Sequence, residues 1–316
     1  MKAEWTVAHM PGQTGRLVVV TGANGGLGRE TCKALARAGA TVVMACRDAG
    51  KGEAAAALIR AEVPGAKLEV VPLDLAKLAS IRAFAAGFIQ HHERLDLLIN
   101  NAGIIGMPLR RTVDGFESMM ATDCLGHFAL TGLLLDRLMA ASTARVVAVG
   151  TSSQPHGWGR IDPDDLNWQR RRFNSLRATL QAKLAFQLCT FELARRLAEQ
   201  SRSQVAALVA HPGIADTDVS LAGPRVAGAM LKLRLLHGFN RVFTQPAAAG
   251  ALPTLYAATD PAAHSGDYIG PDGFLELRGA PKRLKAGAIM RDRALAARLW
   301  ACAEALTGVR YLSSGA

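Results

Sequence analysis

Short, continuous apolar segments alternate along this chain with longer segments in which apolar residues recur at helical spacing. Continuous apolar segments rich in β-branched residues are typical of strands buried on both faces of a parallel sheet. The predicted strands are residues 17–21, 41–46, 68–73, 95–99, 145–149 and 204–210. The predicted helices are residues 27–38, 50–61, 78–91, 115–141 and 177–199. This alternation predicts an α/β fold, a doubly wound parallel sheet with helices on both faces.

No repeat, low-complexity run or linker divides the 316 residues, and half of them are hydrophobic, which supplies a substantial core. We therefore predict a single Rossmann-type domain over residues 14–316, preceded by an extension of residues 1–13. Ligands bind such sheets at the carboxyl ends of the strands. Two irregular stretches follow strands there, residues 151–174 and 213–245. The second stretch suits either packing over the core or a substrate lid.

The charge balance is basic, with 37 Lys and Arg against 26 Asp and Glu, a net charge of +11. Such a charge attracts nucleic acids, membranes or phosphorylated ligands without choosing among them. The basic clusters at 170–172 and 282–285 accompany no nucleic-acid-binding motif. We find no signal peptide and no apolar run of roughly 20 residues that would span a bilayer. We therefore expect a cytoplasmic protein with a small-molecule substrate and no nucleic-acid or membrane partner.

The five cysteines are scattered without a CxxC pair, so neither a zinc site nor a disulfide framework is indicated.

A glycine-rich turn directly follows the first predicted strand and precedes the first helix. It reads Thr21-Gly22-Ala23-Asn24-Gly25-Gly26-Leu27-Gly28. Glycines permit a tight turn and let backbone amides approach a pyrophosphate, whose negative charge the helix N-terminus stabilises. In this context the turn predicts a dinucleotide site.

The second predicted strand ends in Cys46-Arg47-Asp48, where a dinucleotide fold contacts the adenosine ribose. An acidic residue at that strand end favours NAD, whereas an arginine pairs with the 2′-phosphate of NADP. Arg47, with Arg29 as a second cation, therefore predicts NADP(H) as the cofactor. Asp48 leaves NAD open as the alternative.

Together with further motifs, these features resemble the short-chain dehydrogenase/reductase family, and within it the retinol-dehydrogenase-like oxidoreductases. The similarity covers residues 14–312, and its motifs keep the family's order. They are the TGxxxGxG pattern of residues 21–28, Asp74-Leu75, Asn100-Asn101-Ala102-Gly103, Leu125-Gly126-His127-Phe128, Lys183-Leu184-Ala185, His211-Pro212-Gly213 and Gly270-Pro271-Asp272-Gly273. A homo-oligomer is compatible with this resemblance, because helices flanking the active site often pair in the family.

The resemblance also implies where the cofactor binds. Asp74 and Leu75 would lie beside the adenine. Asn101, Ala102 and Gly103 would line the adenosine and nicotinamide-ribose side. The residues that would close over the nicotinamide and phosphates are Pro212, Gly213 and Thr217.

The same resemblance fails at the residues that carry the chemistry. The family supplies a proton from the Tyr of a Tyr-x-x-x-Lys motif, whose Lys lowers the phenol pKa and holds the ribose. Here Lys183 is present, but Thr179 stands at the Tyr position, and none of the three tyrosines of the chain is nearby. Asp123 stands where the family has an Asn that supports a proton-relay water.

The family's Ser, which orients the carbonyl, has two candidates in this chain. The downstream residues His156 and 159–161 align Ser153 with it, whereas counting from the preceding strand gives Thr151. We prefer Ser153, because a two-residue insertion in the loop explains both alignments.

An aliphatic hydroxyl is a far weaker acid than a phenol, whose pKa near 10 a neighbouring ammonium lowers. The first hypothesis is therefore NADPH-dependent hydride transfer to an iminium or hemiaminal (carbinolamine) carbon of a small metabolite, which needs no proton on oxygen. Asp123 would stabilise the cation, and Thr179 or Ser153 would supply hydrogen bonds.

The second hypothesis is reduction of a carbonyl or activated C=C bond with a substitute acid, such as Asp123, Cys124 or a water held by Lys183. The third is a catalytically inactive, NADP-binding regulatory protein.

Overall fold

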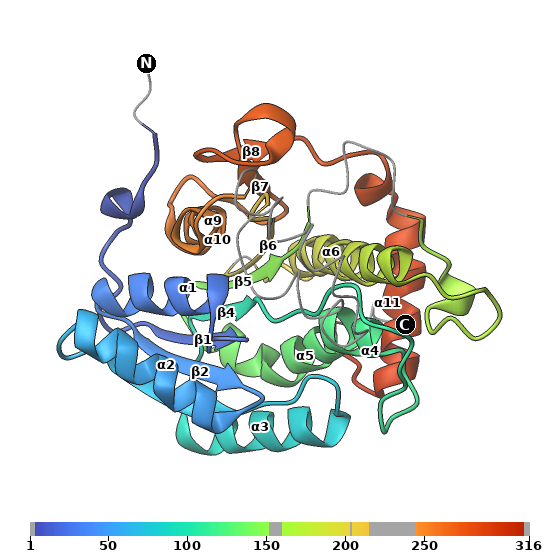
Figure 1. The fold of residues 1–316 in the computed structure, drawn as a ribbon, viewed down its shortest axis with the longest axis horizontal. Coiled ribbons are helices and arrows are strands. Elements are labelled where there is room, and N and C mark those ends of the chain that lie inside the picture. Colours follow the sequence, from blue (N-terminus) through green and yellow to red (C-terminus); the bar gives the residue numbers. More distant parts are fainter. Residues whose placement is uncertain (1–3, 152–159, 203, 215–243, 313–316) are drawn as a thin grey trace, which may run out of the picture.

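The computed structural model describes residues 4–151, 160–202, 204–214 and 244–312. These residues form one eight-stranded sheet in the order β3-β2-β1-β4-β5-β6-β7-β8 (Figure 1). The strands are β1 (Leu17–Thr21), β2 (Thr41–Cys46), β3 (Lys67–Pro72), β4 (Leu97–Asn100), β5 (Ala144–Val149), β6 (Val205–Ala210), β7 (Tyr268–Pro271) and β8 (Pro281–Leu284). All neighbouring strands are parallel except β7 and β8. The predicted doubly wound parallel sheet is confirmed.

Helices pack on both faces of the sheet (Figure 1). One face carries α1 (Gly26–Arg37), α2 (Ala49–Glu62), α9 (Ala247–Gly250) and α10 (Leu252–Thr259). The other carries α3 (Leu78–His91), α5 (Gly126–Met139) and α6 (Ser175–Glu199), with α11 (Arg293–Thr307) packed against α6. The short helical turns are η1 (Val7–His9), α4 (Ser118–Met120), η2 (Ala121–Leu125), η3 (Pro163–Asp165), η4 (Phe274–Glu276) and η5 (Ile289–Arg291).

The central strands are continuous runs of apolar residues because both of their faces are covered. Along β1, Val18 and Val20 pack under α1 and α10, whereas Val19 points to the opposite face and joins the core formed by α3, α5 and α6. All three side chains are fully buried. Successive side chains of a strand point to opposite faces, so neither face of β1 tolerates a polar residue.

The site lies where the strand order reverses. After β3, at one edge of the sheet, the chain returns to pair β4 with the other side of β1. The segments that leave the carboxyl ends of β1 and β4 therefore turn in opposite directions. A crevice opens between such segments, and it is the usual ligand site of doubly wound sheets.

The helix predicted over 115–141 is wrong in its details. It begins only at Ser118, and η2 is a π-helical turn in which the Gly126 N–H bonds to the Ala121 carbonyl five residues earlier. π-Helical turns occur inside α-helices frequently at functional sites. This one contains Asp123.

The two ends of the chain contain features that the sequence analysis missed. Strands β7 and β8 and helices α9, α10 and α11 were not predicted. Within the predicted N-terminal extension, Trp5 donates from Nε1 to Asp260 at 2.7 Å and packs edge-on against Tyr256, so this segment is attached to α10. Most of the predicted lid, residues 215–243, lies outside the described residues.

Candidate functional site

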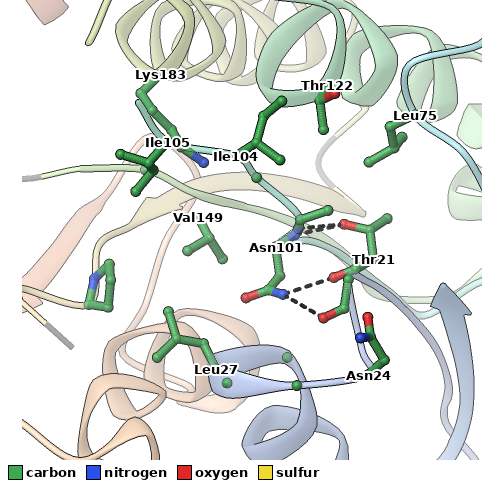
Figure 2. A pocket seen from close by; sticks show the side chains of 18 of the residues that line it. Thr21, Asn24, Leu27, Leu75, Asn101, Ile104, Ile105, Thr122, Val149 and Lys183 are labelled. Carbon is green, nitrogen blue, oxygen red and sulfur yellow. Dashed lines mark hydrogen bonds between the residues drawn. The ribbon is translucent and has the colours of Figure 1, made fainter. Parts of the chain in front are cut away.

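A cleft of about 780 Å³ opens at the carboxyl ends of the parallel strands (Figure 2). Each predicted cofactor residue in the described part of the chain lines this cleft. They are Gly22, Asn24, Gly25, Gly26, Leu27, Gly28, Arg47, Asp74, Leu75, Asn101, Ala102, Gly103, Lys183, Pro212 and Gly213. Thr217 and Ser153 lie outside the described residues. The structure thus brings together Gly22 of the glycine-rich turn and Gly213 of the turn after β6, which are 191 positions apart in the sequence.

The glycine-rich turn fits closely against the turn after β4, and this contact requires glycine. A Cβ on Gly28 would lie 2.2 Å from the Gly22 carbonyl oxygen, and a Cβ on Gly22, whose φ is +65°, would lie 2.9 Å from Ala102 Cα. Helix α1 begins here without a side-chain cap, and no acidic residue occupies its first turn. Its first N–H groups and the positive end of its dipole are therefore available to a phosphate. The cradle fits a dinucleotide pyrophosphate.

Hydrogen bonds between β1 and the segment after β4 hold the floor of the cleft (Figure 2). Thr21 Oγ1 accepts from the backbone N–H groups of Asn101 and Ala102 at 2.9 and 3.0 Å. The Asn101 amide in turn donates to the Thr21 carbonyl at 2.9 Å. His127 Nε2 lies 3.0 Å from the same Thr21 hydroxyl. Burial, and then the charge of Lys183, lowers the pKa of His127 to about 3, so the imidazole is neutral and serves this brace.

The end of the cleft where the adenosine is predicted to lie, called the adenosine end below, is cationic. Arg47 and Lys51 both line it, whereas Asp48 does not. The Asp48 carboxylate accepts the Lys51 backbone N–H at 3.0 Å and caps α2. Sequence reasoning missed Lys51, and its only signal was its position one helical turn beyond Arg47. Arg29, predicted as a second cation, does not line the cleft and pairs with Glu30 at 3.4 Å.

The opposite end of the cleft contains Lys183, with Asp123 behind it. Lys183 Nζ lies so near the turn after β4 that a Cβ on Gly103 would be 2.4 Å from it. Asp123 is fully buried and does not line the cleft. Its Oδ1 accepts the Ile104 N–H at 2.8 Å, and its Oδ2 is 3.5 Å from Lys183 Nζ. Burial raises the pKa of Asp123 to about 6, although Lys183 and the Ile104 N–H both oppose the rise.

Thr179 lies at the edge of the cleft, but its hydroxyl is engaged inside the fold. The side chain is buried, and Oγ1 accepts the Gly106 N–H at 3.0 Å. The single proton of the hydroxyl is directed to the Ser175 carbonyl at 2.9 Å or to Met119 Sδ at 3.1 Å. A hydroxyl has one proton to donate, so this one has none to offer into the cleft in the observed rotamer.

The walls beside Lys183 are mostly apolar, and the sequence analysis did not identify them. They are formed by Ile104, Ile105, Thr122, Val149, Leu180 and Ile214. Thr151, the alternative candidate for the Ser position, also lines the cleft. Cys124, considered as a substitute acid, is buried, and its contact with Cys189 and its burial raise the pKa of its thiol. Because Cys124 does not line the cleft, it is a poor acid for this site.

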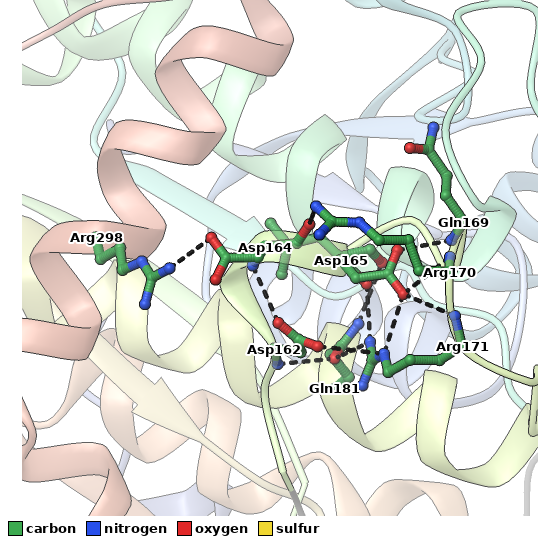
Figure 3. A network of polar contacts seen from close by, with 9 residues as sticks. Asp162, Asp164, Asp165, Gln169, Arg170, Arg171, Gln181 and Arg298 are labelled. Atoms are coloured by element: carbon green, nitrogen blue, oxygen red, sulfur yellow. Dashed lines mark hydrogen bonds and ion pairs between the residues drawn. The ribbon is translucent and has the colours of Figure 1, made fainter.

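A polar network fastens the loop of residues 160–172 to α6 (Figure 3). The buried Asp165 carboxylate accepts three backbone N–H groups, of residues 169–171, and Arg171 Nε at 3.1 Å. Gln181 donates to the Leu166 carbonyl and accepts the Asp162 N–H, both at 3.1 Å. Gln181 stands between Thr179 and Lys183 in sequence, so the network fixes α6 where its cleft-facing residues lie.

Comparisons with known proteins agree with this geometry. Residues 16–159 match the family model of the short chain dehydrogenases. The chain is 41% identical to human retinol dehydrogenase 13 over 96% of this chain and 86% of that protein. It is 37% identical to mouse polyprenol dehydrogenase, covering 98% of this chain and 88% of that one. A crystal structure of an uncharacterised protein from Mycobacterium paratuberculosis is 41% identical, with a TM-score of 0.78 over 97% of this chain and 98% of that chain.

These relatives contradict the expectation of a cytoplasmic protein. They are named for retinol and polyprenol, lipid alcohols that partition into membranes, and they favour a membrane-associated protein. The described residues also contain one helical stretch, Ser118–Met139, that is long and apolar enough to cross a membrane. This stretch was missed as an apolar run. By itself it is weak support, since 78% of its apolar window is buried inside the fold.

Proposed function

This chain belongs to the short-chain dehydrogenase/reductase family and is an oxidoreductase, and we propose that it transfers hydride between NADP(H) and a carbonyl or alcohol carbon bound beside Lys183. The proposal rests on the arrangement of charged and hydroxyl groups at the end of the cleft that contains Lys183, called the chemical end below. Of the three cations among the described lining residues, Lys183 alone lies away from the Arg47 end, and the proton of Thr179 is directed away from the cleft.

The preference for NADP(H) rests on the adenosine end. Arg47 and Lys51 present two positive charges where the ribose would lie, and an arginine can bind a phosphate through two parallel hydrogen bonds. The acidic residue that left NAD open, Asp48, is occupied as the cap of α2. The bound cofactor supplies the hydride, and the glycine cradle and the Thr21–Asn101 brace hold it in place.

Lys183 is the group that can move a proton at the substrate. When hydride reaches a carbonyl carbon, the oxygen gains negative charge, which an adjacent ammonium stabilises and then protonates. Lys183 would give that proton from Nζ, directly or through one water, and be left as the neutral amine. Asp123, 3.5 Å away, offsets the lysine's charge and holds its side chain against the turn after β4.

The apolar walls indicate the kind of substrate. Five of the six wall residues named above are aliphatic, the sixth presents only a small hydroxyl, and none is charged, so they suit a hydrocarbon chain. The names of the relatives, retinol and polyprenol dehydrogenase, agree with this chemistry. We therefore propose an apolar primary alcohol, or its aldehyde, as the substrate class.

Hydride transfer to an iminium or hemiaminal carbon is the second candidate. It is favoured by the absence of a free hydroxyl acid at position 179, because an iminium carbon needs no proton on oxygen. It is disfavoured by Lys183, whose charge repels a cationic substrate, while Asp123 reaches the cleft only through that lysine. The site therefore supports the carbonyl reaction better.

A label-transfer experiment separates the candidates. The protein would be incubated with NADPH deuterated at nicotinamide C4 and one candidate substrate in each reaction. The candidates are retinal, a long-chain aliphatic aldehyde, a cyclic imine and an enone. We expect deuterium at the carbonyl carbon of the aldehydes, detected by mass spectrometry. Label in the amine alone would replace the proposal with imine reduction. Tight NADPH binding without label in any product would identify a regulatory NADP-binding protein.

A further inference from the structure

The turn formed by residues 273–278 has a strained backbone beside the cleft. Leu275 and Glu276 adopt φ angles of 52° and 57°, the left-handed conformation that residues with a Cβ rarely occupy. Burial of side chains does not compensate for this strain, because Phe274 is 82% and Leu275 45% exposed. Strained backbone of this kind persists only where the surroundings hold it, and it often marks a functional site.

The buried contact that holds this turn runs from Glu276 to His211. His211 is fully buried, and its Nε2 lies 3.2 Å from Glu276 Oε2. Neither atom forms a geometrically regular hydrogen bond in the described part of the chain, so the contact between them is electrostatic. The Gly213 N–H points at His211 Nδ1 at 3.3 Å, which makes Nδ1 the acceptor and leaves the proton on Nε2, facing the carboxylate. A Cβ on Gly270 would lie 1.9 Å from Nε2, so the ring has no room to turn away.

The same turn forms the back of the cleft wall opposite Arg47. The Ile214 N–H donates to the Leu277 carbonyl at 2.9 Å, and a Cβ on Gly213 would lie 2.2 Å from that oxygen. Gly213 and Ile214 line the cleft directly after β6, on the far side of β1 and β4 from the adenosine end. A dinucleotide extended across the strand-order reversal would place its nicotinamide half against this wall.

We propose that Glu276 is a positioning residue for the nicotinamide end of the cleft. Its contact with His211 holds the turn in its left-handed shape, and in that shape the turn presents the Leu277 carbonyl to Ile214. Glu276 does not line the cleft, so it would act through His211 and the wall. The inference rests on the proposed NADP(H) site.

Two ligands of different length test the proposal in the full chain. NADPH occupies the whole cleft, whereas adenosine 2′,5′-bisphosphate carries only the adenosine half and its 2′-phosphate. Dissociation constants for both would be measured by titration calorimetry. We expect Glu276→Ala to weaken NADPH binding about tenfold and to change binding of the bisphosphate by less than about twofold. Glu276→Gln, whose amide oxygen can face His211 Nε2 as the carboxylate oxygen does, should restore most of the NADPH affinity.

The control is a variant that loses folding stability at a position whose hydrogen-bond partners do not line the cleft. Asp260→Ala removes a carboxylate that accepts Trp5 Nε1 and the Ala262 N–H, and neither partner lines the cleft. It should leave both dissociation constants unchanged. If Glu276→Ala fails to fold, Glu276→Asp, whose shorter side chain draws the carboxylate away from His211, should show the same selective loss in smaller degree.

The outcomes separate this inference from the proposed function. If the wild-type protein binds neither ligand, both the cofactor site and the role of Glu276 are overturned. If it binds both and the Glu276 variants weaken both equally, or neither, the role of Glu276 alone is overturned, and the residue is merely structural.

Discussion

The two ends of the cleft are built on different principles. The adenosine end is formed by backbone atoms and exposed cationic side chains. Its glycines allow close contact because they lack a Cβ atom, and its cations face solvent. The chemical end consists of side chains whose polar atoms are already paired inside the fold. Lys183 pairs with the buried Asp123, and the Thr179 hydroxyl bonds to Gly106 and Ser175. The shape of the adenosine end therefore depends on close backbone contacts. The chemistry of the other end depends on which atom each hydroxyl or ammonium proton points to.

This difference explains why loss of the usual tyrosine leaves the cofactor end intact. In the described part of the chain, the hydrogen bonds of Thr179 go to Gly106, Ser175 and Met119, and none goes to the pyrophosphate cradle or the Thr21–Asn101 brace. The chemical end can thus vary while the proposed dinucleotide site keeps its shape. The proposed reaction at that end then depends on the cation that remains, Lys183.

The largest expected effect concerns that cation. Lys183→Met removes the ammonium and keeps an unbranched side chain, so kcat should fall by about 10²- to 10⁴-fold, the usual contribution of a general acid. Binding of adenosine 2′,5′-bisphosphate should be unchanged, since Lys183 lies at the opposite end of the cleft. A variant that retains more than about a tenth of the wild-type kcat would remove Lys183 from the proton transfer.

The next largest effect is expected at the glycine-rich turn. In Gly28→Ala the new Cβ would lie 2.2 Å from the Gly22 oxygen, so the cradle must distort, at a cost of about 1–3 kcal/mol and with loss of NADPH binding. Gly87→Ala is the matched control, because in α3 the added Cβ meets nothing within 4 Å. It should raise the free energy of unfolding by about 0.5–1 kcal/mol and leave binding unchanged. Urea unfolding and NADPH titration of both variants measure the contrast.

A smaller effect is expected at the cations of the adenosine end. Arg47→Leu should lower the preference for NADPH over NADH by about tenfold, because a charged hydrogen-bonding partner of the 2′-phosphate is lost. Arg29→Leu should leave the preference unchanged, since Arg29 does not line the cleft. The ratio of kcat/KM values for the two cofactors is the measurement. An unchanged ratio in Arg47→Leu would mean that Arg47 does not recognise the phosphate.

The residues that the sequence analysis placed at the adenosine end lie together in the structure. The glycine-rich turn, Arg47 and the Asn101-Ala102-Gly103 turn all line one cleft, and the sheet has the predicted topology. Such features are predictable because a glycine required by a close contact, and a strand buried on both faces, leave a local pattern. Lys51 was missed because a lysine one helical turn from Arg47 has the same pattern as any solvated residue.

The chemical end was predicted only as a set of residue types. The alignment that placed Thr179 and Asp123 did not reveal that the hydroxyl donates inward, or that Asp123 lies behind Lys183. Those facts depend on the π-helical turn at Asp123 and on the path of the segment after Gly103, which bring Ile104 and Gly106 against side chains far along the chain. Contacts of such long range have no signature in local periodicity.

A pH-dependent effect of about 1 kcal/mol is expected from Asp123. Its pKa rises from the ordinary 3.8 to about 6 on folding, so the protonated form is favoured in the folded chain. Stability gained from that form is complete below pH 3.8 and is lost as pH rises through about 6. Asp123→Asn resembles the protonated form at every pH, and its stability relative to wild type should therefore increase by about 1 kcal/mol between pH 5 and pH 7.5. Urea unfolding at the two pH values would show it, and an unchanged difference would mean that the pKa is not raised.

The smallest expected effect tests the central claim most directly, that the proton of this site does not come from the residue at the usual tyrosine position. Thr179→Val keeps the shape of the side chain and removes its hydroxyl. The measurement is kcat with the aldehyde that accepts deuterium in the label-transfer experiment. We predict a kcat within about fivefold of wild type, because that hydroxyl donates only to Ser175 or Met119. A loss of about 100-fold or more, equal to that of Lys183→Met, would make Thr179 the acid and contradict the account.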